Sequence, residues 1–79
     1  MITARQIRAG RALLRWSQQK LADRALLSRN AVAQIERGEV DPRTSTLAAA
    51  RLALEKGGVV FIPASGRQGE GVRAAKPED

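Results

Sequence analysis

Residues 16–38 read WSQQKLADRALLSRNAVAQIERG, which is the most informative segment of the chain. It contains two short helical patterns, about 17–24 and 28–37, each opened by a serine that can cap the free N–H groups of a first turn. Gly38 follows the second pattern and can take the left-handed conformation that ends a helix. The turn between the patterns is so short that the two helices must cross, which predicts that the second helix projects outward.

Helical patterns on either side of this pair complete a four-helix unit. A first helix is expected over about residues 3–15 with Thr3 as its cap, and a fourth runs from the cap Thr44 until Gly57 and Gly58 end it. The apolar surface of that fourth helix is expected to come from Leu47, Ala48, Leu52 and Leu54.

The chain changes character after this unit, which occupies residues 1–58. Val59–Ile62 is a β-branched and aromatic run between a glycine and a proline, which predicts a strand. A glycine-rich loop follows, and residues 72–74 favour a weaker second strand, so we predict a short C-terminal β-strand or hairpin over 59–75. The charged residues 76–79 are expected to form a disordered tail. The expected fold class is therefore mainly α with a short β extension.

A two-stranded hairpin is barely stable alone in water, so its apolar side chains need a cover. Two alternatives can bury these side chains: the first and fourth helices of the same chain, or a second copy of the protein. An unpaired apolar strand invites pairing with its symmetry mate, which favours the second copy. The predicted dimerisation residues are Val59, Val60, Phe61 and Ile62.

The charge balance points to a polyanionic partner. Fourteen Lys and Arg residues stand against eight Asp and Glu, which gives a net charge of +6. Most of the basic residues are arginine, whose planar fork matches phosphate oxygens and the guanine edge. The alternative is that arginines only solubilise the surface, which we expect of Arg5, Arg8, Arg15, Arg24 and Arg51.

A chain of 79 residues has room for one small domain with a modest core. It has no cysteine, so no disulfide can staple it, and this composition suits a reducing cytoplasm. No apolar run approaches the length of a signal or membrane-spanning segment. We therefore expect a soluble, cytoplasmic protein without membrane contact.

Catalytic chemistry finds little support in this composition. The chain lacks histidine, cysteine and tyrosine, and its acidic residues show neither paired-carboxylate nor metal-ligand spacing. The glycines of residues 66–71 do not open a helix after a strand, as a phosphate-binding loop would. RNA-binding modules need exposed aromatic side chains, whereas Trp16 and Phe61 are expected in the core. We therefore expect no enzyme, no metal and no cofactor.

Short motifs in the helical unit carry a resemblance to a known family. They are Leu21-Ala22, Ser28-Arg29 and Ile35–Gly38, followed by Pro42 and Thr46-Leu47. At these spacings they resemble the Xre/Cro helix-turn-helix family of phage-repressor-like DNA-binding proteins, over roughly residues 3–57. The resemblance implies a lambda-repressor-like fold and the function of a sequence-specific transcriptional regulator. Of the two signs of regulation, repression is the one expected. The resemblance further implies that a homodimer binds a palindromic operator on double-stranded DNA.

Carried over residue by residue, the resemblance places the helix of about residues 28–37 in the major groove, which an α-helix fits. The expected base contacts are Arg29, Asn30, Ala31, Ala33 and Gln34. The expected contacts to the DNA backbone are Ser17, Gln18, Lys20, Arg37 and Arg43. The free N–H groups at the start of the preceding helix would add a site for an anion.

The resemblance also implies one structural ion pair and shows two departures. Arg11 and Glu36 should form a partly buried pair that ties the first helix to the third. Leu26 stands where a glycine with positive φ is usual, so either the turn is distorted or the preceding helix is extended. Lys20 stands where a capping box prefers Glu or Gln, so that helix start lacks one reciprocal bond.

A second function class stays open. An antitoxin or anti-regulator would act mainly by binding another protein, through the C-terminal strand or through a helix face. Such proteins often bind DNA as well, so a regulatory protein partner is compatible with both interpretations.

Overall fold

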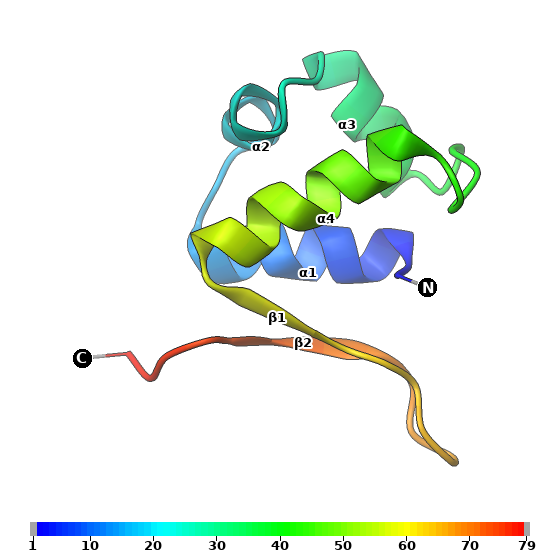
Figure 1. Cartoon of the computed structure of the whole chain (residues 1–79), viewed down its shortest axis with the longest axis vertical. Coiled ribbons are helices and arrows are strands. Elements are labelled where there is room, and N and C mark those ends of the chain that lie inside the picture. Colours follow the sequence, from blue (N-terminus) through cyan, green and yellow to red (C-terminus); the bar gives the residue numbers. More distant parts are fainter. Residues whose placement is uncertain (1, 79) are drawn as a thin grey trace.

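Within residues 2–78, four helices and a two-stranded hairpin follow one another along the chain (Figure 1). The computed structural model describes residues 2–78, so Met1 and Asp79, at the ends of the predicted helical unit and tail, lie outside the described residues. The elements are α1 (Ala4–Leu14), α2 (Gln18–Ala25), α3 (Arg29–Glu36), α4 (Ser45–Gly57), β1 (Val59–Ile62) and β2 (Gly71–Ala74). The prediction of a mainly α fold with a C-terminal hairpin is confirmed.

Hydroxyl side chains cap these helices, as the sequence predicts. The caps are Thr3, Ser17, Ser28 and Thr44, and each accepts a hydrogen bond from the backbone N–H three residues on. At Thr3 the bond is reciprocal, because the Gln6 side chain accepts from the Thr3 N–H at 2.9 Å. At Ser17 the corresponding residue is Lys20, which has no acceptor to return the bond.

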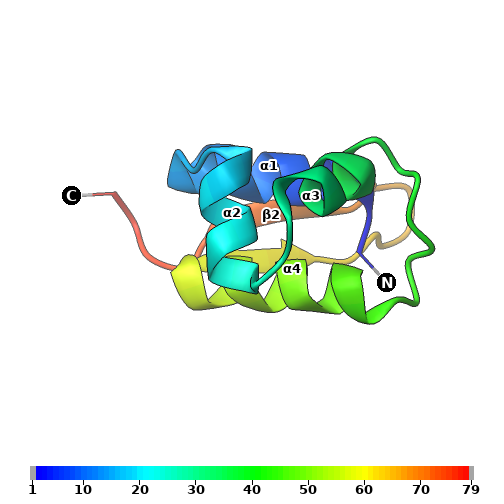
Figure 2. The same ribbon diagram turned by 90° about the horizontal axis from the view of Figure 1, so that it is seen from above.

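The elements stack in three layers (Figure 1). The pair α2 and α3 lies on one side of the molecule, α1 and α4 lie in the middle, and the hairpin lies on the opposite side. Seen from the side of α2 and α3, α1 and α4 run along opposite flanks, and α3 lies towards the α1 flank (Figure 2). The helix α3 and the hairpin therefore face opposite directions.

The core lies between the helices and extends to the hairpin. Its buried apolar residues are Ile2, Ile7, Leu21, Ala22, Val32, Ile35, Leu47, Ala50, Ala53, Leu54 and Val59. The predicted apolar surface of α4 is wrong at Ala48 and Leu52, which are exposed, whereas Ala50 and Ala53 are buried. Residues at spacings of three and four share a helix face, and residues 48 and 52 belong to the face opposite the core.

One face of the hairpin packs on the chain's own helices. The strands β1 and β2 pair antiparallel with Phe61 opposite Val72, and both side chains pack against the core beside the buried Val59. Val60 and its partner Arg73 lie on the other face of the sheet. Of the two expected ways to bury the apolar side chains of the hairpin, packing against helices of the same chain is therefore present for this face. The role of Val59–Ile62 in joining a second copy stays a prediction.

Polar side chains at the start of α1 fasten the end of the hairpin. The amide of the buried Gln6 donates to the carbonyl oxygens of Ile62 at 3.1 Å and Gly71 at 2.9 Å. Arg5 donates from Nε and Nη2 to the Glu70 carboxylate at 2.5 and 2.7 Å. The expectation that Arg5 is only a solvated charge is therefore wrong, because its guanidinium holds the loop that leads into β2.

Leu26 ends α2 in the left-handed conformation. Its φ is 58° and its ψ is 43°, and its N–H donates to the Ala22 carbonyl. The turn therefore keeps the geometry that glycine usually fills, and α2 is not extended through it. The Leu26 side chain is 92 % exposed, so packing does little to offset the left-handed strain of about 1 kcal/mol or more.

Candidate nucleic-acid interface

The helix α3 turns one face to the core and the opposite face to solvent. Its buried residues are Val32, Ile35 and Glu36. Of the predicted base contacts, Arg29, Asn30 and Gln34 are exposed, and Ala31 and Ala33 are half-buried. The exposed guanidinium and amide groups are the donors and acceptors that match base edges. All five residues belong to α3, and this helix lies on the side of the molecule away from the hairpin (Figure 1).

Glu36 fixes the position of α3 against α1. Its carboxylate is 5 % exposed and accepts from Arg11 Nε at 2.7 Å and from Arg11 Nη2 at 3.0 Å. The guanidinium of Arg8 donates to the Glu36 backbone carbonyl. The expected pair of Arg11 and Glu36 is thus present. Arg8 adds a second link from α1, so the expectation of a merely solvated Arg8 is wrong.

Gln18 joins the same cluster from α2, because its Nε2 donates to Glu36 Oε1 at 3.1 Å. Burial disfavours the charged form of Glu36, but hydrogen bonds from Arg11 and Gln18 outweigh it and set the pKa of Glu36 below its ordinary value. The hydrogen bond to Glu36 raises the pKa of Arg11. Both groups stay charged at neutral pH, and α1, α2 and α3 meet at one carboxylate.

The first group of predicted DNA-backbone contacts lies at the start of α2. The Ser17 hydroxyl accepts from the Lys20 N–H at 3.0 Å, and the Lys20 ammonium lies 5.9 Å from the centroid of the Trp16 ring. The Gln18 side chain is already committed to the carboxylate cluster. The backbone N–H groups of Gln18 and Gln19 have no helical carbonyl partner, so the backbone supplies the donors for an anion here.

The second group lies in the loop from α3 to α4. Arg37 is exposed, but its guanidinium donates to the Glu39 carboxylate at 2.7 and 3.1 Å. The Arg43 N–H donates to Asp41 Oδ1 at 2.9 Å, which shapes the loop. Within residues 2–78 the Arg43 guanidinium has no ion-pair partner. Arg43 can therefore meet a phosphate directly, whereas Arg37 must first leave Glu39.

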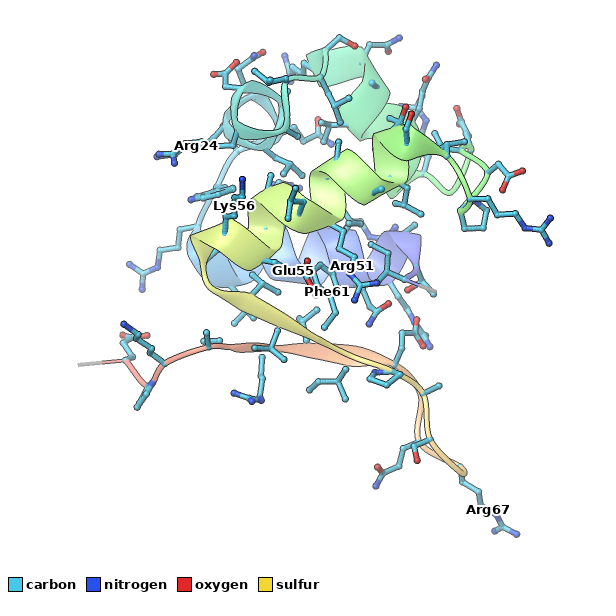
Figure 3. All side chains as sticks on the ribbon, viewed as in Figure 1. Arg24, Arg51, Glu55, Lys56, Phe61 and Arg67 are labelled. Carbon is cyan, nitrogen blue, oxygen red and sulfur yellow. The ribbon has the colours of Figure 1, made fainter. Side chains whose placement is uncertain are left out.

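Two further arginines lie against aromatic rings, which the sequence did not indicate. The guanidinium of Arg24 lies 5.5 Å from the centroid of the Trp16 ring. The guanidinium of Arg51 lies 5.5 Å from the centroid of the Phe61 ring (Figure 3). Both rings are half-buried, and both guanidinium groups lie within the distance of a cation–π contact. The members of each pair belong to different segments of the chain, so no local spacing could have predicted the contacts.

The exposed side chains of α3 offer hydrogen-bonding groups and positive charge. The described residues contain no group of three potential metal ligands. Among the helices described, none is long and apolar enough to cross a membrane.

Two short crossed helices, with the second presenting polar side chains outward, define a helix-turn-helix DNA-binding unit. The family model described as helix-turn-helix matches residues 7–57, from within α1 to the end of α4. The chain belongs to this helix-turn-helix family, of the Xre and lambda-repressor type, which groups DNA-binding transcription regulators. The hairpin lies beyond the matched residues. No curated protein matches the chain.

Proposed function

We propose that this protein is a transcriptional repressor that reads the major groove of double-stranded DNA with α3. The observation that supports this most is the division of α3 into an anchored inner face and an outer face that exposes Arg29, Asn30 and Gln34. Arg29 would pair with guanine or with a phosphate, and the two amides with adenine. Ala31 and Ala33 would approach the methyl groups of thymine.

The proposed phosphate contacts position α3 and carry no sequence information of their own. At the start of α2 they are made by the Ser17 hydroxyl, the Gln18 N–H and the Lys20 ammonium. Beyond α3 they are made by Arg37 and Arg43. These two groups flank α3 along the chain, so together they would hold the helix in the groove.

The proposal includes a homodimer on a roughly palindromic operator. One α3 reads only a short half-site, and two-fold partners bind half-sites about one DNA turn, about 34 Å, apart. The repressor would work in the cytoplasm, on bacterial or phage DNA, without a cofactor.

Selection from a random DNA pool with the full-length chain tests this function. We expect an enriched sequence with two related half-sites, bound roughly 1,000-fold more tightly than random DNA at the same salt concentration. A chain that enriches no common sequence and binds all duplexes equally would contradict base reading.

A second function, as an antitoxin or anti-regulator, is favoured by the outward face of the hairpin. Ile62 is 39 % exposed and Val60 also lies on this face, opposite α3. Another protein could bind there while α3 occupies DNA. A gel shift on the promoter upstream of the protein's own gene, with and without the neighbouring gene product, distinguishes the two. If the neighbouring gene product changes the amount or the mobility of the protein–DNA complex, the second function is supported.

A further inference from the structure

We infer that the outer side of α4 is the surface on which a second copy of this chain docks, an inference that rests on the homodimer proposed above. The α4 stripe consists of Ala48, Arg51, Leu52 and Glu55. These four residues are exposed and share one side of the helix at spacings of three and four. Leu52, near the middle of the stripe, is 52 % exposed.

The direction of α3 restricts where the interface can lie. Two α3 helices can enter one face of a duplex only if they point the same way, so the two-fold axis must run along that direction. The outer face of the hairpin lies opposite α3 (Figure 1). Copies joined through Val60 and Ile62 on that face would aim their α3 helices away from each other. The interface must therefore lie on a flank of the molecule.

The edges of the hairpin are shielded on both flanks. The hairpin lies beneath α1 and α4, and β2 packs under the first while β1 packs under the second (Figure 2). Two helices of about 10 Å diameter side by side are wider than two strands about 5 Å apart. A second copy would therefore meet the helices before its strand reached hydrogen-bonding distance of β1 or β2.

The α1 flank has unfavourable charge and spacing for a symmetric contact. The helix α1 contains no acidic residue, and its Arg5 is already paired with Glu70. Arg8 and Arg15 are exposed along the helix and just after it, and within residues 2–78 they have no ion-pair partner. A symmetry mate would place these cations against their own copies, which is repulsive. Since α3 lies towards this flank, contact through α1 would also bring the two α3 helices close together (Figure 2).

The α4 stripe is complementary to itself. In a two-fold contact, residue i meets residue j of the mate and residue j meets residue i. Antiparallel α4 helices that cross near Leu52 place the two leucines together and set Arg51 of each copy beside Glu55 of the other. Within one chain these two side chains form an exposed pair at 3.3 Å, with 44 % and 40 % exposure (Figure 3). They can therefore exchange partners across the axis.

The thickness of the molecule suits this arrangement. The direction from the α1 flank to the α4 flank is its shortest, and the Cα atoms extend only 16 Å along it. Packed helices have axes about 8–10 Å apart, so the two far flanks of an α4-joined dimer would lie at most roughly 40 Å apart. Each α3 lies towards a far flank, so a separation of about 34 Å, one DNA turn, is within reach.

Matched charge substitutions at three exposed apolar residues test the inference in the full-length chain. Leu52→Glu places a charge in the α4 stripe and is the test variant. The two controls are Leu13→Glu, which places a charge on α1, and Ile62→Glu, which places one on the outer face of the hairpin. We expect Leu52→Glu alone to abolish cooperative binding to the selected two-half-site operator. Affinity for a single half-site and the Tm should stay unchanged. Cooperative binding that survives Leu52→Glu, or that is lost with either control, overturns the inference.

A mixing experiment separates the contact between copies from the pair within one chain. Arg51→Glu places acids against acids across the axis, and Glu55→Arg places bases against bases, so each variant alone should bind without cooperativity. Mixed in equal amounts, the two variants restore both cross-axis pairs although neither chain regains its internal pair. Cooperative binding by the mixture, but by neither variant alone, is the expected result. A mixture that behaves like its components contradicts the inference.

The binding experiments distinguish an absent homodimer from a homodimer that is joined elsewhere than at α4. If the wild-type chain selects no two-half-site sequence, or binds one without cooperativity, the homodimer of the proposed function fails and the α4 contact fails with it. If the wild-type chain and Leu52→Glu both bind such DNA cooperatively, only the α4 contact fails.

Discussion

Arg5 on α1 holds both carboxylate oxygens of Glu70, 65 residues further along the chain, at 2.5 and 2.7 Å. The hydroxyl of Thr3, the cap of α1, donates to the same carboxylate at 2.6 Å. The hydrogen bonds from Arg5 and Thr3 lower the pKa of Glu70 to about 2, from an ordinary value of 4.5. Because Glu70 directly precedes β2, this carboxylate ties the hairpin to the beginning of α1.

Acid should weaken the hairpin contact through Glu70. A carboxylate whose pKa is lowered in the folded state stabilises fully above its ordinary pKa and loses this contribution as the pH falls to the folded value. We expect the Tm of Glu70→Gln to lie below that of the wild type at neutral pH, and the difference to shrink between about pH 4.5 and 2. Thermal unfolding followed by circular dichroism measures both. A difference that stays constant down to pH 2 contradicts the pairing.

Local signals made the helices predictable, whereas long-range contacts left no pattern. Thr44 caps α4 because its hydroxyl reaches a backbone N–H three residues away, and such spacing can be read from sequence. The core face of α4 could not be read this way, because a run rich in alanine and leucine offers apolar residues on every side. Tertiary packing determines which residues are buried, and in α4 these include Ala50 and Ala53. The bonds of Gln6 to the hairpin join residues far apart in the chain.

The candidate site was predictable in outline for a similar reason. Val32 and Ile35 fix the inner face of α3, so the opposite face follows from the helical period. The helical period does not show which polar side chains are already hydrogen-bonded within the chain. Gln18 gives its amide to Glu36, and Arg37 gives its guanidinium to a neighbouring carboxylate.

Loss of the buried carboxylate of Glu36 should destabilise the whole helical unit. Glu36→Ala leaves Arg11 and Gln18 without their acceptor in a buried site, which we expect to cost about 3 kcal/mol and roughly 10–20 °C in Tm. The control is Glu39→Gln, which removes a carboxylate from an exposed ion pair and should barely change the Tm. Denaturant unfolding of both variants checks the contrast, and equal stabilities would show that the buried pair contributes little.

Base-reading and phosphate-binding side chains should respond differently to DNA sequence. Gln34→Ala should weaken operator binding by about 1–3 kcal/mol and relax the preference at one base position, because an amide pairs with a particular base edge. Arg43→Ala should weaken binding to operator and random DNA alike. Titrations of both duplexes at one salt concentration measure the two losses. Equal losses on both duplexes for Gln34→Ala would remove its base-reading role.

Glycine at position 26 should stabilise the fold or leave its stability unchanged. Leu26 holds a φ of 58° with its side chain in solvent, so Leu26→Gly relieves strain without opening a cavity. The gain is offset in part by the greater freedom of glycine in the unfolded chain. The control is Leu13→Gly inside α1, where ordinary helical geometry makes the same change cost about 1 kcal/mol. A lower Tm for Leu26→Gly would show that the exposed leucine contributes contacts of its own.

Glu39 should restrain DNA binding by competing for Arg37. The hydrogen bond from Arg37 lowers the pKa of Glu39, so the carboxylate is charged at neutral pH and both occupies the guanidinium and repels phosphate. Glu39→Gln should therefore raise the affinity for operator and random DNA alike, and steepen the dependence of log K on log salt by up to about 0.9, the value for one added phosphate contact. Titrations at several salt concentrations measure both effects. In the double variant Arg37→Ala/Glu39→Gln the steeper slope should disappear, and a gain that persists there would assign it to simple charge removal instead of a released Arg37.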